Sequence, residues 1–317
     1  MSVLVYAESL GNKCKKSAFE AVSYGHKLAK SKGTDLHVLV IGEAENAAEL
    51  GIYGASVVKQ IKPPFNHLDD KIYTNLIVDY AGQVSAQYLV LSSSSTGKTI
   101  GGKCAVKMGA AFISSANSIL EDQEITRLVF SGKAIATYQL RSEKIVISVM
   151  GNSMAAEQIG SACDVEILDI AVPDSDIEVV ETNLQEGQVP LPEAELVVSG
   201  GRGFKGPENW GILLELADAL GAATACSRPV ADNEWRPHHE HVGQTGVAIS
   251  PNLYVAIGIS GAIQHLGGVN NSKTIVVINK DPEAPFFKAA DYGVVGDLFE
   301  VVPRLTEAVK QYKAASD

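Results

Sequence analysis

Apolar residues in the first half of the chain occur in short continuous runs, separated by longer stretches whose apolar positions recur at helical spacing. Runs of roughly four to eight residues that are rich in β-branched side chains are typical of buried strands. We expect such strands at 3–7, 36–41, 88–91, 134–140 and 144–149. Between the first two, the recurrence of Ala18, Val22 and Ala29 predicts a helix, and a second helix is expected over 73–86.

The same alternation resumes after a segment over 172–192, which carries three prolines, several acids and little periodicity and which we interpret as an interdomain connection. Later strands are expected at 195–198, 253–257, 274–278 and 292–295, and later helices at 209–220, through His265 and at 302–312. The alternation predicts an α/β protein with two doubly wound, mostly parallel-sheet domains. We expect them to span 1–190 and 191–317, with a Rossmann-like C-terminal domain.

Composition and charge narrow the class of protein. The chain has 317 residues, 46% of them hydrophobic and 20% charged, which suits two globular domains. A net charge of −11 and the lack of a basic patch disfavour nucleic-acid binding. No apolar run approaches the roughly 18 residues of a membrane-spanning helix, so no membrane insertion is expected. The N-terminal sequence MSVLVYAE enters a strand pattern directly, so we expect a cytoplasmic protein that begins near Met1.

Two Gly-rich turns in the second half each follow a predicted strand: VVSGGRGF over 197–204 and YVAIGISGAIQH over 254–265. Glycines at such turns let the backbone approach a phosphate, which the first N–H groups of the next helix bind. Neither turn is a full GxGxxG, and each alone is as readily a tight turn with no ligand. Two of them at the carboxyl edge of one sheet favour a ligand site. Arg202 lies among the glycines of the first turn, where a pyrophosphate partner would explain its position.

A long segment between these turns, 225–251, has little periodicity and many hydrogen-bonding side chains. Long irregular segments in compact domains are usually functional or disordered, and Trp235 with the apolar run at 247–249 argues against disorder. Its Ser227-Arg228-Pro229 and Gly243-Gln244-Thr245-Gly246 elements are suited to holding a planar polar ring.

Several other features do not support a site. The segment SSSSTGKT over 92–99 resembles a phosphate-binding P-loop but has Ser92 where the first glycine is needed. His238, His239 and His241 lack further residues at a spacing that completes a metal site. The cysteines, at 14, 104, 163 and 226, form no CxxC pair, which predicts reduced thiols. No arrangement of residues singles out a catalytic nucleophile, acid or base.

The stretch PNLYVAIGISGAIQHLGGVNNSKTIVVINKDPEAPFFKAADYGVVGDLFEVVP closely resembles the C-terminal region of electron-transfer flavoprotein α subunits. The upstream elements VVSGGRGFK, SRPVAD and VGQTG match the same family in order and spacing. The match is dense over roughly 195–305, whereas the first half resembles the family only in architecture and in its SSSSTGK loop. The resemblance implies a heterodimer with a β subunit, and FAD held mainly by the C-terminal domain of this chain. AMP or a second flavin on the β subunit is also compatible with the resemblance.

Individual residues take their implied roles from the family's motifs. Arg202 matches the arginine of the GGRG turn, near the phosphate side of the cofactor. Ser227 and Arg228 match the SR pair, whose arginine lies against the isoalloxazine ring. Gln244 and Thr245 match the QT pair, with the threonine hydroxyl near flavin N5.

The turn after 253–257 supplies the other implied cofactor contacts. Ser260 and Gly261 match the pyrophosphate turn, and Gly258 and Gln264 belong to the same stretch. His265 matches the histidine that faces the flavin C2 carbonyl.

The resemblance also bears on three further positions, Asn279, Asp297 and His241. Asn279 and Asp297 match residues on the ribityl–adenosine side. His241 stands where many relatives carry glutamine, a departure that leaves its effect on the flavin potential open.

The residues agree with a carrier role. Reduction of a flavin places negative charge near N1 and the C2 carbonyl, where Arg228 and His265 would stabilise it. Thr245, near N5, is a poor proton-transfer group, which disfavours direct catalysis on a metabolite.

The resemblance implies electron transfer from flavin dehydrogenases, such as the acyl-CoA dehydrogenases of fatty acid β-oxidation, to an acceptor such as a quinone oxidoreductase. The alternatives are an electron-bifurcating subunit, a flavin-dependent oxidoreductase that acts on its own substrate, and a nucleotide-binding regulatory protein.

Overall fold

The computed structural model describes residues 1–130, 132–181 and 189–316, so part of the predicted connection at 172–192 lies outside the described residues. The chain divides into two compact units. The first comprises Met1–Leu128 and Ile135–Asn183, and the second Val129–Ala134 and Leu184–Asp317. No helix in the described part of the chain is long and apolar enough to cross a membrane.

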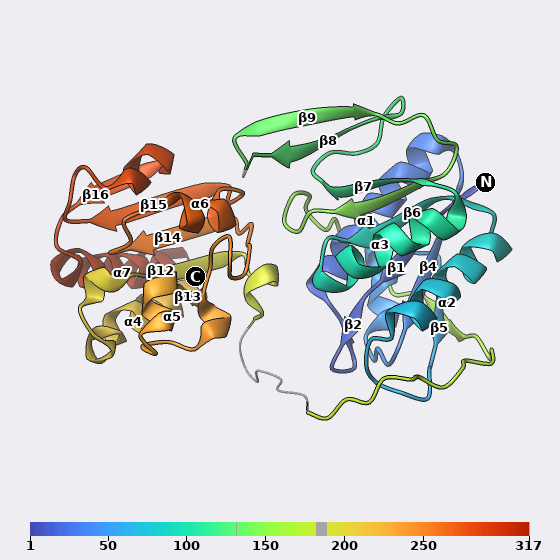
Figure 1. The fold of residues 1–317 in the computed structure, drawn as a ribbon, viewed down its shortest axis with the longest axis horizontal. Coiled ribbons are helices and arrows are strands. Elements are labelled where there is room, and N and C mark those ends of the chain that lie inside the picture. Colours follow the sequence, from blue (N-terminus) through green and yellow to red (C-terminus); the bar gives the residue numbers. More distant parts are fainter. Residues whose placement is uncertain (131, 182–188, 317) are drawn as a thin grey trace. The chain divides into compact units, whose positions relative to one another are not determined.

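A nine-stranded sheet forms the centre of the first unit, in the order β11-β5-β4-β1-β6-β10-β7-β8-β9 (Figure 1). Pairing is parallel from β11 to β7 and antiparallel between β7 and β8. The strands are β1 (Ser2–Ala7), β4 (Asp35–Ile41), β5 (Val57–Ile61), β6 (Ala86–Ser92), β7 (Ala111–Ala116), β8 (Glu124–Val129), β9 (Ala134–Gln139), β10 (Ile145–Val149) and β11 (Asp164–Ile167). A small antiparallel ribbon, β2 (Ser9–Leu10) and β3 (Lys13–Cys14), follows β1.

Helices cover both faces of this sheet. The side chains of β1 alternate between the two faces and therefore pack in two separate apolar cores. Val3 and Val5 pack in the core that contains α1 (Lys16–Lys32), whereas Leu4 and Tyr6 pack in the core that contains α2 (Asp70–Gln83) and α3 (Ser95–Met108). Every residue of β1 is buried. The first unit is therefore doubly wound, as the sequence predicts.

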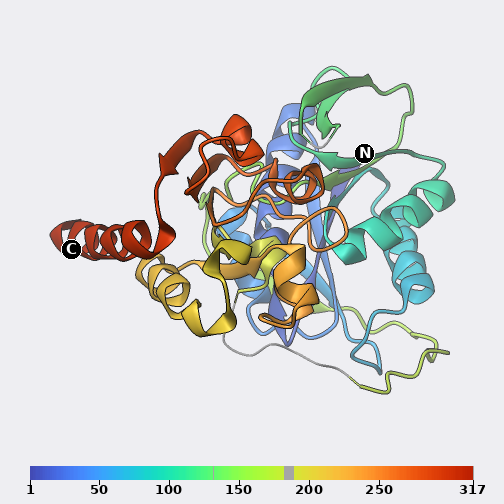
Figure 2. The same cartoon turned by 60° about the vertical axis from the view of Figure 1, so that its left-hand side comes forward.

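The second unit has a five-stranded, fully parallel sheet in the order β13-β12-β14-β15-β16. Its strands are β12 (Leu196–Gly200), β13 (Ala223–Cys226), β14 (Leu253–Ile257), β15 (Thr274–Asn279) and β16 (Tyr292–Val295). Its helices are α4 (Gly211–Leu220), α5 (Arg228–Asp232), α6 (Ile263–Val269) and α7 (Leu298–Ser316), the last drawn in red in Figure 2. The predicted α/β class with mostly parallel sheets is confirmed, and the second sheet has the flavodoxin-like order of the doubly wound folds.

Two local predictions differ from the structure. The SSSSTGK stretch, interpreted from the sequence as a loop, instead contains a helix start: α3 begins at Ser95, and the Ser94 hydroxyl caps it by accepting a hydrogen bond from the Gly97 N–H at 3.0 Å. Such a cap needs only a serine before the helix, so a Ser-rich segment is compatible with a helix start. The helix expected over 73–86 covers Asp70–Gln83 instead, capped by Asp69, and β6 begins at Ala86.

Candidate functional site

The two Gly-rich turns of the second unit lie side by side at the carboxyl ends of β12 and β14. The Gly201 N–H donates to the Ile257 carbonyl at 2.9 Å, and the Gly203 N–H donates to the Gly258 carbonyl at 3.1 Å. A Cβ atom on Gly201 would lie 2.3 Å from the Gly258 carbonyl oxygen. The close approach of the two turns therefore requires glycine at this position.

The order of the strands makes these turns the natural place for a ligand. After β12 the chain continues to β13 on one side, and it then crosses back to β14 on the other side of β12. Ligands of open α/β sheets bind in the crevice at such a switch point, outside the carboxyl ends of the strands.

A cavity of about 430 Å³ lies beside the turns. It is lined by Arg202, Gly203, Lys205, Gly258, Asn279, Lys280, Asp297, Leu298 and Phe299. Three of these side chains are cationic and one is acidic, so the lining favours an anion. The donor set, the close backbone and the beginning of α7 together fit a pyrophosphate group.

The cavity brings together four of the predicted residues, Arg202, Gly258, Asn279 and Asp297. Asn279 also shapes the turns, because its Nδ2 donates to the Ile259 carbonyl at 3.0 Å. The Asp297 carboxylate accepts a hydrogen bond from the Phe299 N–H at 2.9 Å, at the start of α7.

Two further cations of this cavity, Lys205 and Lys280, were missed from the sequence. Lys205 follows β12 and its Gly-rich turn, in GGRGFK, and Lys280 directly follows β15, in VVINK. A cation just after a predicted strand was the signal that the sequence offered. The Lys205 ammonium lies 5.2 Å from the centre of the Phe299 ring, a contact that positions the cation at the wall of the cavity.

A second group of predicted residues gathers around the loop at 241–247. This loop is held to the end of β13 by the Val242 N–H, which donates to the Cys226 carbonyl at 3.0 Å. It is held to α6 by the Gln244 N–H, which donates to the Gln264 carbonyl at 2.7 Å. Gln244, Thr245, Ser260 and Gln264 are exposed along the same edge of the sheet.

Arg228 begins α5 directly after the end of β13, with Ser227 as the residue that precedes the helix. Its guanidinium Nε lies 3.3 Å from the Asp232 carboxylate, and 63% of its side chain is exposed. Burial lowers the pKa of the neighbouring His241 below its ordinary value, and the positive charge of Arg228 lowers it further, against an opposing effect of Asp232. The permanent cation of Arg228 at the start of α5 is thus accompanied by the largely neutral imidazole of His241.

His265 is buried, with 7% of its surface exposed. Its Nε2 lies 2.8 Å from the Tyr254 hydroxyl, and its buried Nδ1 has no hydrogen-bond partner within the described part of the chain. Burial, with a smaller contribution from His241 and against an opposing effect of the Val242 backbone, lowers the pKa of His265 to about 4. The imidazole is therefore neutral at physiological pH. Its role toward the flavin C2 carbonyl stays a prediction, and because Nε2 lies against Tyr254, Nδ1 is the atom that would have to make this contact.

This shifted pKa predicts how stability depends on pH. Above pH 6.5 His265 is neutral in both the folded and the unfolded chain and contributes no pH dependence. As the pH falls from 6.5 toward 4, the unfolded chain takes up a proton that the folded chain refuses, so the folded state loses up to about 3 kcal/mol. Between pH 7 and pH 5 the loss is about 2 kcal/mol.

Denaturant unfolding of the unliganded chain at these two pH values measures the effect. We expect His265→Gln to remove about 2 kcal/mol of the difference between pH 7 and pH 5, whereas the exposed His239→Gln leaves it unchanged. Equal pH differences for the wild type and His265→Gln would show that His265 titrates normally in the folded state.

Within residues 1–130, 132–181 and 189–316, no group of three or more His, Cys, Asp or Glu side chains is arranged to hold a metal ion. All four cysteines are free thiols, three of them buried.

Comparison with known proteins agrees with both units. Residues 3–175 match the model of the electron transfer flavoprotein domain, and residues 190–270 match that of the electron transfer flavoprotein FAD-binding domain. The electron transfer flavoprotein subunit alpha of Bacillus subtilis is 36% identical over 318 residues, covering 98% of this chain and 97% of that protein. The corresponding subunit of Pseudomonas aeruginosa is also 36% identical, over 316 residues and 98% and 100% of the two chains. The mitochondrial subunit of Dictyostelium discoideum is 36% identical over 329 residues, 98% of this chain and 92% of that protein.

Proposed function

This chain belongs to the electron transfer flavoprotein α-subunit family, an assignment that brings FAD as its cofactor, and on that premise we propose how its residues serve electron transfer. We propose that it pairs with a β subunit and carries electrons from flavin dehydrogenases, such as acyl-CoA dehydrogenases, to an acceptor such as a quinone oxidoreductase. On this proposal the chain turns over no substrate of its own.

The cationic cavity beside the Gly-rich turns is the observation that supports this function best. Arg202, Lys205 and Lys280 line it at the carboxyl edge of a parallel sheet. We assign these three cations to the pyrophosphate of FAD, together with the turn at Ser260 and Gly261. Positive side chains and close backbone N–H groups at such an edge stabilise a diphosphate without requiring a full dinucleotide motif.

The loop at 241–247 and the start of α5 are assigned to the flavin ring. When bound, FAD supplies the redox chemistry, and the chain supplies position and charge. Arg228 places a permanent positive charge beside the ring, which stabilises the negative charge that reduction adds. Gln244 and Thr245 are exposed and offer neutral hydrogen-bonding groups to the ring edge.

The same residues support a carrier and not an enzyme with its own substrate. A flavin enzyme that abstracts a proton needs an acid or base with a pKa near the working pH. The assigned ring contacts are Arg228, which stays charged, Thr245, which transfers protons poorly, and His265, whose pKa is about 4. None of these three is suited to general acid–base catalysis at neutral pH.

For the N-terminal domain, residues 1–190, we propose the role of a platform for the protein partners. Strand β9 forms one free edge of the nine-stranded sheet and exposes Ile135 and Tyr138, at 66% and 39%. Apolar side chains on a free edge strand are typical of a surface that another chain covers.

A rapid-mixing experiment tests the proposed function. The complex of this chain with its β subunit is loaded with FAD and mixed with a substrate-reduced acyl-CoA dehydrogenase, while flavin absorbance is followed. We expect the complex to be reduced by the dehydrogenase and reoxidised by a quinone oxidoreductase. Reduction of the complex by the organic substrate alone, without any second enzyme, would contradict the carrier role.

A further inference from the structure

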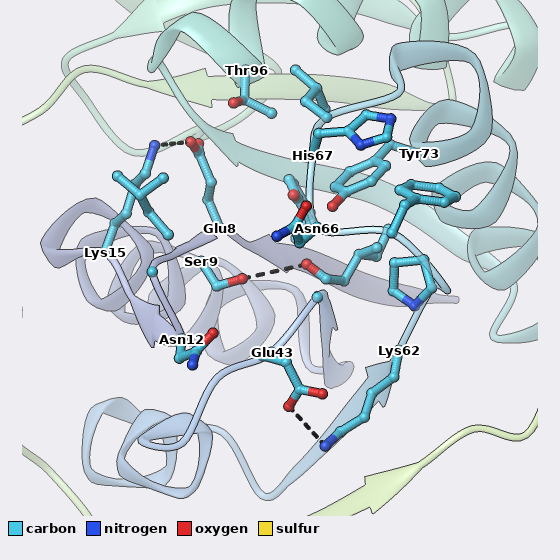
Figure 3. A pocket seen from close by; sticks show the side chains of 18 of the residues that line it. Glu8, Ser9, Asn12, Lys15, Glu43, Lys62, Asn66, His67, Tyr73 and Thr96 are labelled. Carbon is cyan, nitrogen blue, oxygen red and sulfur yellow. Dashed lines mark hydrogen bonds and ion pairs between the residues drawn. The ribbon is translucent and has the colours of Figure 1, made fainter. Parts of the chain in front are cut away.

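The first unit contains a cavity whose lining includes none of the residues assigned to FAD (Figure 3). Its volume is about 640 Å³, within the range of small-molecule pockets. It opens at the carboxyl ends of β1 and β4, where the strand order reverses: β4 and β5 lie on one side of β1, and β6 lies on the other. This is again the switch point at which open α/β sheets bind their ligands.

Two largely buried tyrosines, Tyr6 and Tyr73, line the cavity. Tyr6 is 3% exposed and Tyr73 is 8% exposed, and their rings meet edge to face at 6.3 Å between centres. Neither hydroxyl forms a hydrogen bond with any residue that the structure describes. Burial and the nearby carboxylate of Glu8 raise the pKa of both phenols, that of Tyr73 to about 12, so both remain protonated donors at neutral pH. These hydroxyls line the cavity, where a ligand or water can accept a hydrogen bond from them.

The charges in the cavity are already paired. The Lys15 ammonium forms an ion pair with Glu8, and that of Lys62 lies 2.8 Å from the Glu43 carboxylate (Figure 3). Glu8 also accepts a hydrogen bond from the Ser94 hydroxyl. An anionic ligand would therefore find each lysine neutralised by a carboxylate, in a chain whose net charge is −11.

Apart from these ion pairs, the polar side chains of the lining are amides, hydroxyls and the imidazole of His67, whose Nε2 lies 3.0 Å from the Ser175 hydroxyl, and one wall is apolar. Asn12, Asn66 and Thr96 are among the residues that line the cavity (Figure 3). Pro63, Pro64, Phe65 and Leu68 come from the connection between β5 and α2 and form the apolar part of the lining. A flat ring fits such a wall, and neutral donors and acceptors on its other side suit a polyol or a base edge.

We propose that this cavity binds an uncharged nucleoside, with its base against the apolar wall and its acceptors toward the hydroxyls of Tyr6 and Tyr73. A purine nucleoside has the required combination of flat heterocycle and neutral sugar. The phosphate of a nucleotide would add a negative charge where both lysines of the lining are already paired with carboxylates.

Calorimetric titration of the full chain, saturated beforehand with FAD, tests the proposal. The probes are adenosine, guanosine, AMP and ribose. We expect at least one of the two purine nucleosides to bind at one site per chain, and more tightly than AMP or ribose. Tyr73→Phe should weaken that binding by about 2- to 10-fold, the effect of losing one buried hydrogen bond.

Tyr80→Phe is the matched control, because Tyr80 lies on the same helix, is equally buried and does not line the cavity. Asn66→Ala provides a second variant on the rim if Tyr73→Phe lowers the melting temperature, and it should weaken binding too. The proposal is overturned if neither purine nucleoside binds at millimolar concentration to a chain that holds FAD. It is also overturned if AMP binds tenfold more tightly than either nucleoside, if ribose binds as tightly, or if Tyr73→Phe and Asn66→Ala behave like Tyr80→Phe.

Discussion

Gly261→Ala should abolish FAD binding and lower the free energy of unfolding by about 2–5 kcal/mol. Gly261 has a φ of +83°, which favours glycine, and a Cβ atom there would lie 2.5 Å from the backbone N and Cα of Phe286. Those atoms cannot move aside easily, because the Phe286 N–H donates to the Ser260 carbonyl at 3.1 Å. The substitution therefore strains the turn and separates it from the segment that supports it.

Denaturant unfolding of the unliganded chain and equilibrium titration with FAD measure the two effects. Gly211→Ala is the control, because Gly211 begins α4 and a Cβ atom there would meet open space. We expect that variant to be as stable as the wild type or more stable, by up to about 1 kcal/mol, with unchanged FAD affinity. A Gly261→Ala chain that unfolds and binds FAD like the wild type would show that the turn is not shaped as described.

Arg228→Ala should lower the first reduction potential of the bound flavin by about 60 mV. A hydrogen bond to a charged group contributes about 1.5–3 kcal/mol, and the lower end applies because 63% of the Arg228 side chain is exposed. For a one-electron step, about 1.4 kcal/mol corresponds to about 59 mV. The sign follows from charge, because removal of a cation makes the added electron less stable.

Redox titration of the FAD-loaded complex with indicator dyes measures this potential. Arg228→Lys keeps the charge and should shift the potential less than Arg228→Ala. Arg304→Ala removes an exposed cation from α7 in the same unit and should leave the potential unchanged. If Arg228→Ala behaves like Arg304→Ala, Arg228 does not contact the ring.

Much of the fold follows from the spacing of apolar residues. The predicted strand at 253–257 matches β14, and the runs at 3–7 and 36–41 lie within β1 and β4, because central parallel strands are buried on both faces and carry continuous apolar runs. Strands with a less regular pattern were missed. β11, at one edge, has only one residue that is even partly buried, so its sequence carries no apolar run.

The site was predictable where it depends on local sequence. Arg202 stands among the glycines of the first turn, each turn directly follows a predicted strand, and the structure places both turns at one sheet edge. Lys205 and Lys280 lie 75 positions apart and meet only because the β12 and β15 ends adjoin one cavity. The burial of His265 against Tyr254 likewise results from packing between α6 and β14, which periodicity cannot show.

The central claim is that the cationic cavity and Gly-rich turns of the second unit bind FAD. Titration of the unliganded full chain with FAD, followed by flavin fluorescence, tests it most directly when NADH is included as a competitor. We predict one FAD per chain, no displacement by NADH, and weaker binding when Arg202 and Lys280 are both replaced by alanine. Absence of FAD binding, displacement by NADH, or unchanged affinity in the double variant would contradict the claim.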